Sequence, residues 1–265
     1  MGSQARQRIY PSCQNGFLMP PQFLITIPPG ASSWGQSLLL SPEESHHVRE
    51  VFRLKEGDIL NVFDGRGNRY SARLGKTEGP RVSILLLEKL PEPEARSVIC
   101  LGQSLLKGEK MEWVLQKSVE LGVHSFQPFY SSRTIVKGTV SGNKDTRWKR
   151  IIESSSKQCG RSSLMEIAPA VSFHDLVIGS KAPLKIVFWE EETKNLRDFF
   201  GEIHLSPHPP LTLVLIGPEG GFSKEEIQEA KDHGFVSLSL GPRILRVDTA
   251  AVMALSLVQY ELERK

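Results

Sequence analysis

Hydrophobic and polar positions follow two different rhythms along the chain, and the rhythm changes near residue 91. Before that point, apolar runs of strand length recur at 23–27 ("FLITI"), 59–65 ("ILNVFDG") and 81–90 ("RVSILLLEKL"), which predicts β-strands. Turn-forming residues at 64–68 predict a hairpin between "ILNVF" and the following "RYSARL". Several strands in so short a stretch predict a small β-barrel over residues 20–92.

One stretch inside this region has the pattern of a helix. Ser41 is a suitable N-cap, Pro42 suits a first helical turn, and Glu44 stands in the reciprocal position of a capping box. We therefore expect a short helix within residues 41–54. The segment 91–96, "PEPEAR", predicts a linker, because two prolines and three charges do not continue a strand easily.

Beyond the linker, strand-like and helix-like segments alternate. A capping box from Ser223 to Glu226 predicts the start of one helix, and residues 249–263 predict a largely buried final helix. This alternation predicts an α/β domain with a mostly parallel sheet over residues 97–265. The expected strands are "SVICLGQSL" (97–105), "SFQPFYS" (125–131), "KIVFWE" (185–190), "TLVLI" (212–216) and "VSLSL" (236–240), and the other expected helices span 108–123 and 145–160.

Composition is that of an ordinary globular protein, with 39% hydrophobic and 24% charged residues in a chain of 265. No apolar stretch reaches the roughly 18 residues that suggest a membrane span, so we expect no membrane association. The cysteines, Cys13, Cys100 and Cys159, are odd in number and far apart. This argues against a disulfide framework or a metal site and indicates a cytoplasmic protein. We interpret residues 1–19 as a disordered leader or a cloning remnant.

Charge is distributed unevenly along the chain. From residue 104 to residue 161 there are 11 Lys and Arg against 5 Asp and Glu, and from 188 to 232 there are 4 against 10. A basic middle third favours a polyanionic partner such as a nucleic acid. On charge alone, a set of solvated helix faces is an equally good explanation.

A glycine-rich loop, "LIGPEGGFSKEE" (215–226), follows one expected strand and opens a helix. In α/β sheets, ligands bind at the carboxyl ends of strands. The loop lacks both the Walker signature and the dinucleotide fingerprint, and the neighbouring Glu219, Glu225 and Glu226 would repel a pyrophosphate. It suits a ligand without phosphates, such as S-adenosylmethionine with its cationic sulfonium and ammonium groups. Taken alone, it is equally typical of a tight strand-to-helix turn.

A second loop of the same design, "LGPRILRVDTAA" (240–251), also closes a strand and opens a helix. Arg243 and Arg246 flank an apolar pair there, which is unfavourable unless each guanidinium has a partner or a substrate. Asp248 or Thr249 is the expected cap of the final helix. Two such loops are less readily explained as ordinary turns.

Together, "LIGPEGGFS" and "LGPRILRVDTAA" resemble the ribosomal RNA small subunit methyltransferase E family of knotted SPOUT methyltransferases. The resemblance extends to "HHVREVFRLKEGD" (46–58), "QKSVELGV" (116–123) and "RWKRIIESSSKQCGR" (147–161). Asp248 stands where that family usually has Glu. The resemblance implies a PUA-like barrel, a C-terminal trefoil knot that joins the loops after "VICLG", "TLVLI" and "VSLSL", a homodimer, and methylation of uridine N3 in 16S ribosomal RNA with S-adenosylmethionine.

The resemblance also implies roles for individual residues. Arg246 is the expected stabiliser of charge on the uracil, and Glu219 and Asp248 are candidate general bases, although a nearby arginine would lower their pKa and weaken them.

Helix geometry argues that His46 and His47 do not bind a metal, because adjacent helical residues do not share a face. The expected cofactor contacts are Leu215, Ile216, Gly217, Gly220, Gly221, Leu240, Gly241, Ile244, Leu245 and Thr249, and the expected RNA contacts are Arg49, Arg53, Arg133, Gln158 and Arg161.

Other functions remain open at this point. The chain could be a SPOUT methyltransferase for another position in ribosomal or transfer RNA. It could also be a knotted RNA-binding protein without catalysis, although such a protein would have no reason to keep both "GPEGG" and "RILR". A dinucleotide oxidoreductase is weakly supported, because its fingerprint is missing.

Overall fold

The computed structural model describes residues 21–27, 35, 37–91, 97–136, 143–203 and 210–264. The chain divides into two compact units, one of Met1–Pro93 with Ser156–Leu164 and the other of Glu94–Ser155 with Met165–Lys265. The leader expected at 1–19 and most of the linker expected at 91–96 lie outside the described residues. Within the described ranges, no helix combines the length and the apolar character needed to cross a membrane.

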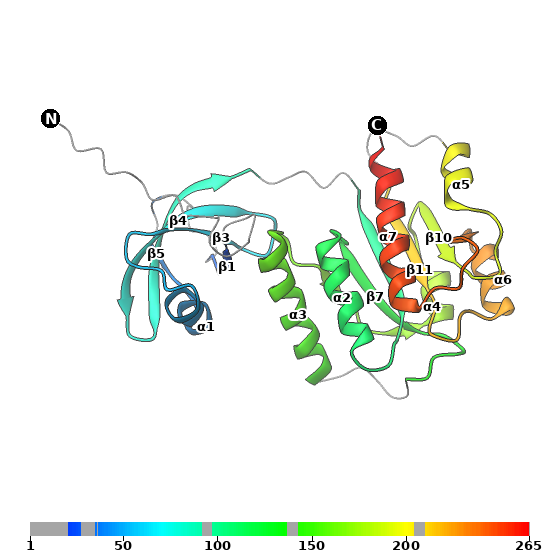
Figure 1. The fold of residues 1–265 in the computed structure, drawn as a ribbon, viewed down its shortest axis with the longest axis horizontal. Helices are drawn as coiled ribbons and strands as arrows, with labels where there is room; N and C mark the ends of the chain where they lie inside the picture. The colour runs from blue at the N-terminus through cyan, green and yellow to red at the C-terminus, as the bar shows by residue number, and fades with distance from the viewer. Residues whose placement is uncertain are drawn as a thin grey trace. The chain divides into compact units, whose positions relative to one another are not determined.

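The first unit is built on a five-stranded sheet with the order β1-β3-β4-β5-β2 (Figure 1). The expected hairpin is confirmed, because β3 and β4 pair antiparallel across residues 64–68. β1 joins the other side of β3 in parallel, while β2 pairs antiparallel with β5. The strands are β1 (Gln22–Leu24), β2 (Ser37–Leu39), β3 (Ile59–Phe63), β4 (Arg69–Glu78) and β5 (Arg81–Leu90).

A short helix crosses this sheet region, as expected. It consists of α1 (Pro42–His46) and a π-helical turn η1 (His47–Val51), and the Ser41 hydroxyl accepts a 3.1 Å hydrogen bond from the Glu44 N–H. The expected reciprocal contact of Glu44 is wrong. Its buried carboxylate instead pairs with the Lys157 ammonium, because a charge in the interior requires a cationic partner.

Residues 156–164 belong to the first unit by their hydrogen bonds. The Gln22 side-chain amide donates to the carbonyls of Ser156 at 3.0 Å and Arg161 at 2.8 Å. Further along, Gly67 N–H donates to the Ser162 carbonyl at 3.2 Å, and the Gly65 carbonyl accepts from Leu164 N–H at 2.9 Å. Four hydrogen bonds, two of them between backbone groups, therefore attach this segment, which is distant in sequence, to the first unit.

The second unit is a parallel α/β sheet, which confirms the expected class. Its strand order is β12-β10-β11-β6-β7-β8, with β9 pairing with β7, and every pairing is parallel. All five residues of the central β11 are buried, as a strand covered on both faces requires. The strands are β6 (Ile99–Ser104), β7 (Ser125–Tyr130), β8 (Glu166–Ile167), β9 (Val171–Ser172), β10 (Leu184–Phe188), β11 (Thr212–Ile216) and β12 (Val236–Leu238).

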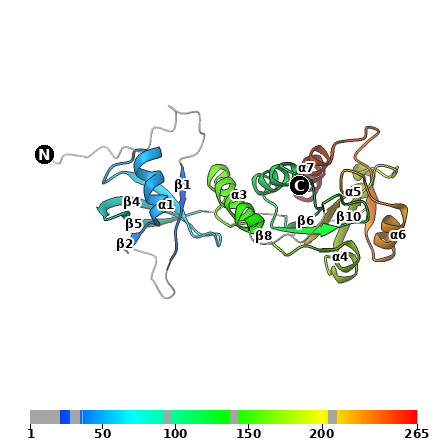
Figure 2. The ribbon, with the colours of Figure 1, turned by 90° about the horizontal axis from the view of Figure 1, so that it is seen from below.

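Helices cover both faces of this sheet, with α2 and α7 on one side and α4 and α6 on the other (Figures 1 and 2). The Ser223–Glu226 capping box at the start of α6 is confirmed in both directions. α4 and α5 were not expected from the sequence, although Ser172 and Asn195 cap them. The helices are α2 (Lys110–Glu120), α3 (Asn143–Cys159), α4 (Phe173–Gly179), α5 (Leu196–Glu202), α6 (Lys224–Asp232) and α7 (Val247–Glu263).

The expected cap of the final helix is wrong. α7 begins at Val247, its N-cap is Arg246, and no side chain caps it. The helix starts earlier than the sequence suggested because the apolar Val247 is buried in its first turn. Asp248 lies inside that turn, where its negative charge interacts favourably with the helix dipole. Its Oδ1 accepts a hydrogen bond from Thr249 N–H at 3.0 Å.

Candidate functional site

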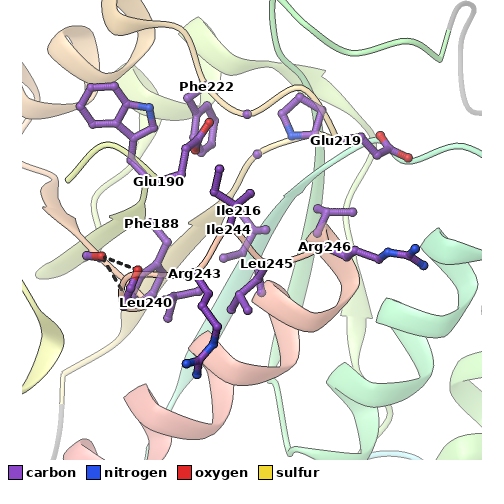
Figure 3. Close-up of a pocket in the computed structure, with 18 of the residues that line it drawn as sticks. Phe188, Glu190, Ile216, Glu219, Phe222, Leu240, Arg243, Ile244, Leu245 and Arg246 are labelled. Carbon is purple, nitrogen blue, oxygen red and sulfur yellow. Dashed lines mark hydrogen bonds between the residues drawn. The ribbon is translucent and has the colours of Figure 1, made fainter. Parts of the chain in front are cut away.

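A pocket of about 620 Å³ opens where the loops after β10, β11 and β12 converge (Figure 3). Its position at the carboxyl ends of parallel strands is the usual place for a ligand in an α/β sheet. Its lining consists of Lys110, Phe188, Trp189, Glu190, Ile216, Gly217, Pro218, Glu219, Gly221, Phe222, Ser239, Leu240, Gly241, Arg243, Ile244, Leu245, Arg246, Val247 and Ala250.

The β11 loop forms one wall, and it is held from below by Gln103. This fully buried side chain donates through Nε2 to the carbonyls of Ser104 at 3.1 Å, Gly217 at 3.2 Å and Ile216 at 3.4 Å. Phe222 closes the loop by stacking on Phe129, with ring centroids 6.2 Å apart. The loop therefore has a fixed shape before any ligand arrives, which lowers the entropic cost of binding.

Gly221 is the position where this loop most clearly requires a glycine. Its φ is +68°, a conformation that side chains with a Cβ rarely adopt. A Cβ there would also stand 2.1 Å from Glu190 Oε1. The Glu190 carboxylate therefore occupies the space that the glycine leaves, beside Phe222 (Figure 3).

The β12 loop forms the opposite wall. Ile244 is 87% exposed and lines the pocket, so it offers an apolar surface to a ligand. Figure 3 shows Arg243 and Arg246 extending from this loop in different directions. No described residue forms an ion pair or a hydrogen bond with either guanidinium, so both remain available to a substrate.

The pocket lining carries charges of both signs, with the cations of Lys110, Arg243 and Arg246 and the carboxylates of Glu190 and Glu219. Glu219 forms one ion pair, with Lys110 at 3.4 Å, and Glu190 has no partner among the described residues. Nearby, the pKa of Glu225 lies below its usual value because of hydrogen bonds from its own backbone N–H and from Ser223, and then because of the charges of Arg133 and Lys224. A lining of mixed sign suits a ligand that itself carries both cationic and anionic groups.

Most, but not all, of the catalytic and cofactor-binding residues expected from the sequence line this pocket. Leu215 is wholly buried inside β11, the Gly220 carbonyl faces Arg133, and Thr249 is exposed in the first turn of α7. Asp248 also lies outside the lining. The expected residues that do line the pocket are Glu219, Arg246, Ile216, Gly217, Gly221, Leu240, Gly241, Ile244 and Leu245.

The third wall of the pocket is formed by a different loop from the one expected from the sequence. The loop expected there, the one after β6, reaches the pocket only through Lys110 at the start of α2, and the loop after β10 supplies Phe188, Trp189 and Glu190 instead. β10 lies next to β11 in the sheet, so its carboxyl end necessarily opens beside the glycine loop. The sequence signal was the position of Trp189 and Glu190 directly after an apolar strand.

The expected RNA contacts fall in both units. Arg49 and Arg53 lie in and just after η1 of the first unit, and Gln158 and Arg161 lie in the 156–164 segment that belongs to the same unit. Arg53 has a φ of 53°, which a bulky residue adopts only under constraint. Arg133 is separate from these four, because it follows β7 in the second unit and donates to the Gly220 carbonyl at 2.9 Å.

Comparison with known proteins identifies the family of the chain. The model of the RNA methyltransferase domain family matches residues 93–259, which include the whole pocket, and the model of the RNA methyltransferase PUA domain matches residues 40–87. The chain belongs to the RNA methyltransferase family. The domain match covers both glycine-containing loops, so the pocket lies in the methyltransferase domain.

Similar proteins cover nearly the whole chain. The ribosomal RNA small subunit methyltransferase E of Bacillus subtilis is 31% identical over 230 residues, 84% of this chain and 90% of that protein. The same enzyme from Neisseria gonorrhoeae, solved bound to S-adenosyl methionine, is 31% identical with a TM-score of 0.80, covering 91% of this chain and 97% of that one. A methyltransferase-related structure from Legionella pneumophila in complex with SAM is 36% identical, with a TM-score of 0.80 and coverage of 91% and 98%.

Proposed function

We propose that the protein transfers a methyl group from S-adenosylmethionine to N3 of a uridine in 16S ribosomal RNA. The observation that carries this proposal is the pocket itself, with apolar walls, charges of both signs and two arginines without described partners, in a chain of the RNA methyltransferase family. Relatives named ribosomal RNA small subunit methyltransferase E support the substrate, and structures bound to S-adenosyl methionine support the cofactor.

The residues of the pocket fit this cofactor. The Trp189 indole N–H is buried without a described partner, so the site offers a hydrogen-bond donor as well as the Glu190 acceptor. Gly217 and Gly221 let the backbone approach a flat heterocycle, while Ile244 and Leu245 supply an apolar surface for it. Glu190 is suited to ribose hydroxyls or to an ammonium group, because an ionised carboxylate only accepts hydrogen bonds.

The reaction places two demands on the protein. When bound, the cofactor supplies an electrophilic methyl group, so no protein nucleophile is needed. The N3 proton must leave the uracil, and the charge that develops on the uracil oxygens must be stabilised. Arg246 suits the second task, because a guanidinium offers paired donors and this one has no described partner.

Glu219 is the better candidate for receiving the proton. It lines the pocket with Arg246, whereas Asp248 lies outside the lining and accepts a hydrogen bond from Thr249 N–H. The Lys110 ammonium lies 3.4 Å from Glu219 Oε1 and helps to hold this carboxylate at the pocket.

The proposal also covers the topology of the two domains, the oligomeric state and the cellular compartment. We infer a C-terminal trefoil knot, supported by the convergence of three strand ends on one pocket, and a closed PUA-like barrel, supported by the match of residues 40–87 to the PUA domain of RNA methyltransferases. A homodimer in the cytoplasm is part of the same proposal. It rests on the resemblance to knotted methyltransferases, on the widely spaced cysteines and on a ribosomal substrate.

Thermal unfolding with different ligands tests the proposal. S-adenosylhomocysteine at about 100 times its Kd should stabilise the protein by about 2.7 kcal/mol, which corresponds to a rise in Tm of roughly 5–10 °C for a domain of this size. NAD and ATP should produce no comparable rise. Stabilisation by NAD or ATP, with none by S-adenosylhomocysteine, would exclude the proposed cofactor.

A further inference from the structure

The loop that follows β7, residues 131–134, is attached to the outer side of the glycine loop. Arg133 Nη1 donates to the Gly220 carbonyl at 2.9 Å. The two residues are also packed closely, since a Cβ on Gly220 would stand 3.3 Å from Arg133 Cβ. Gly220 itself does not line the pocket, whereas Glu219 and Gly221 on either side of it do. Arg133 therefore contacts the cofactor loop from behind.

A second contact joins the same two segments. Ser132 N–H donates to Glu226 Oε1 at 2.8 Å, and Glu226 Oε2 accepts from Ser223 N–H at 2.9 Å. Glu226 is only 8% exposed, and burial makes loss of either hydrogen bond costly. One carboxylate thus connects the loop after β7 to the turn that ends the glycine loop.

The 131–134 loop is itself fixed to the sheet. Thr134 Oγ1 accepts from Ser131 N–H at 2.8 Å and shares a 2.9 Å hydrogen bond with Ser104 Oγ at the end of β6. Ser104 is fully buried. Because its base is anchored in this way, the loop provides a rigid support from which Arg133 can hold Gly220.

We propose that Arg133 is a positioning residue for the cofactor loop rather than a phosphate contact for RNA. The inference rests on the proposed function, because it assumes that the pocket binds S-adenosylmethionine. Arg133 fixes the plane of the peptide between Gly220 and Gly221 through the Gly220 carbonyl. That peptide carries the N–H of Gly221, the residue whose missing Cβ leaves room for Glu190. Loss of the Arg133 contact should therefore weaken cofactor binding although Arg133 does not line the pocket.

The test compares Arg133→Met with Lys149→Met. Methionine keeps an apolar stem and removes the donor, and Lys149 is an exposed cation on α3, outside the pocket. Calorimetric titration with S-adenosylhomocysteine, without RNA, should show Kd raised roughly three- to tenfold in Arg133→Met and unchanged in Lys149→Met. Arg133→Lys, which keeps a donor, should recover part of the affinity. The KM for RNA should not change in Arg133→Met, a result that a phosphate contact would not give.

A double-mutant cycle gives an independent readout. Gly220→Ala should push Arg133 away, because the new methyl group stands at 3.3 Å from its Cβ. If the two residues form one contact, the loss of affinity in the double variant should be smaller than the product of the two single losses. If the loss of affinity in the double variant equals the product of the two single losses, the proposal is wrong.

The outcomes separate this inference from the proposed function. A wild-type protein that fails to bind S-adenosylhomocysteine refutes the proposed cofactor and, with it, the role of Arg133. Wild-type binding with an unchanged Kd in Arg133→Met refutes only the positioning role. If the same variant then shows a raised KM for RNA and a weaker salt dependence, Arg133 contacts phosphate instead.

Discussion

Replacing Gly221 by Ala should separate cofactor binding from folding. Two physical effects act at this position. The φ of +68° suits glycine, and an alanine held there costs about 1–2 kcal/mol. In addition, the new Cβ would stand 2.1 Å from Glu190 Oε1 and 2.9 Å from Glu190 Cδ, so the carboxylate must move away.

The magnitudes differ for folding and for binding. Backbone strain alone should lower Tm by roughly 2–8 °C for a domain of this size. Movement of Glu190 relieves the clash, because its end is flexible and exposed, but it removes the acceptor from the pocket. A hydrogen bond to a charged group contributes about 1.5–3 kcal/mol, so we expect Kd for S-adenosylhomocysteine to rise roughly 10- to 150-fold.

Gly234→Ala is the matched control for this experiment. Gly234 also has a positive φ, +83°, but a Cβ there meets no atom within 4 Å, and the residue lies outside the pocket, between α6 and β12. It should lose similar thermal stability and keep the wild-type Kd. Calorimetric titration of both variants measures the affinities, and thermal unfolding measures the strain. A Gly221→Ala variant with a Kd within about threefold of wild type would refute the assignment of Glu190 and the glycine loop to the cofactor.

Three further predictions follow from the site and its surroundings. Arg246→Ala should abolish methyl transfer while Kd for S-adenosylhomocysteine stays within about threefold; normal turnover would contradict this. Glu219→Gln should lower kcat by roughly 10²-fold or more and Asp248→Asn far less, and the reverse order would make Asp248 the base. Burial raises the pKa of Glu192, but hydrogen bonds, first from Lys231, outweigh it and lower the pKa from 4.5 to about 2. Glu192 therefore contributes its full stabilisation above pH 4.5, and this stabilisation is lost as the pH falls towards 2. In urea unfolding at pH 7, the free energy of unfolding of Glu192→Gln should be lower than that of the wild type by about 1–2 kcal/mol. The difference should shrink as the pH falls from 4.5 towards 2.

Local sequence signals predicted the elements that carry the pocket. The apolar run of β11 and the Ser223–Glu226 capping box require only neighbouring residues, and both are present as expected. The cap of α7 was wrong for a local reason as well. Val247 was assigned to the preceding loop, and the structure shows that the helix already includes it, with its side chain buried within the second unit.

The remaining features depend on contacts between distant segments. Glu190 reaches the pocket because β10 pairs with β11, and no pattern within "KIVFWE" specifies which strand lies beside it. Likewise, the Lys157 ammonium neutralises Glu44 across more than 100 residues of sequence, so the reciprocal cap expected from spacing alone did not form. The contact of Arg133 with Gly220 has the same origin, since it requires two loops whose strands are separated in the sheet by β6.

Methylation of small ribosomal subunits tests the central claim most directly. The wild-type protein and Arg246→Ala would each be incubated with S-adenosylmethionine and subunits that lack the modification. The 16S ribosomal RNA would then be digested to nucleosides and separated by chromatography with mass detection. We expect N3-methyluridine with the wild-type protein and none with Arg246→Ala. Methyl groups on another nucleoside, or no product from a protein that binds the cofactor, would contradict this claim.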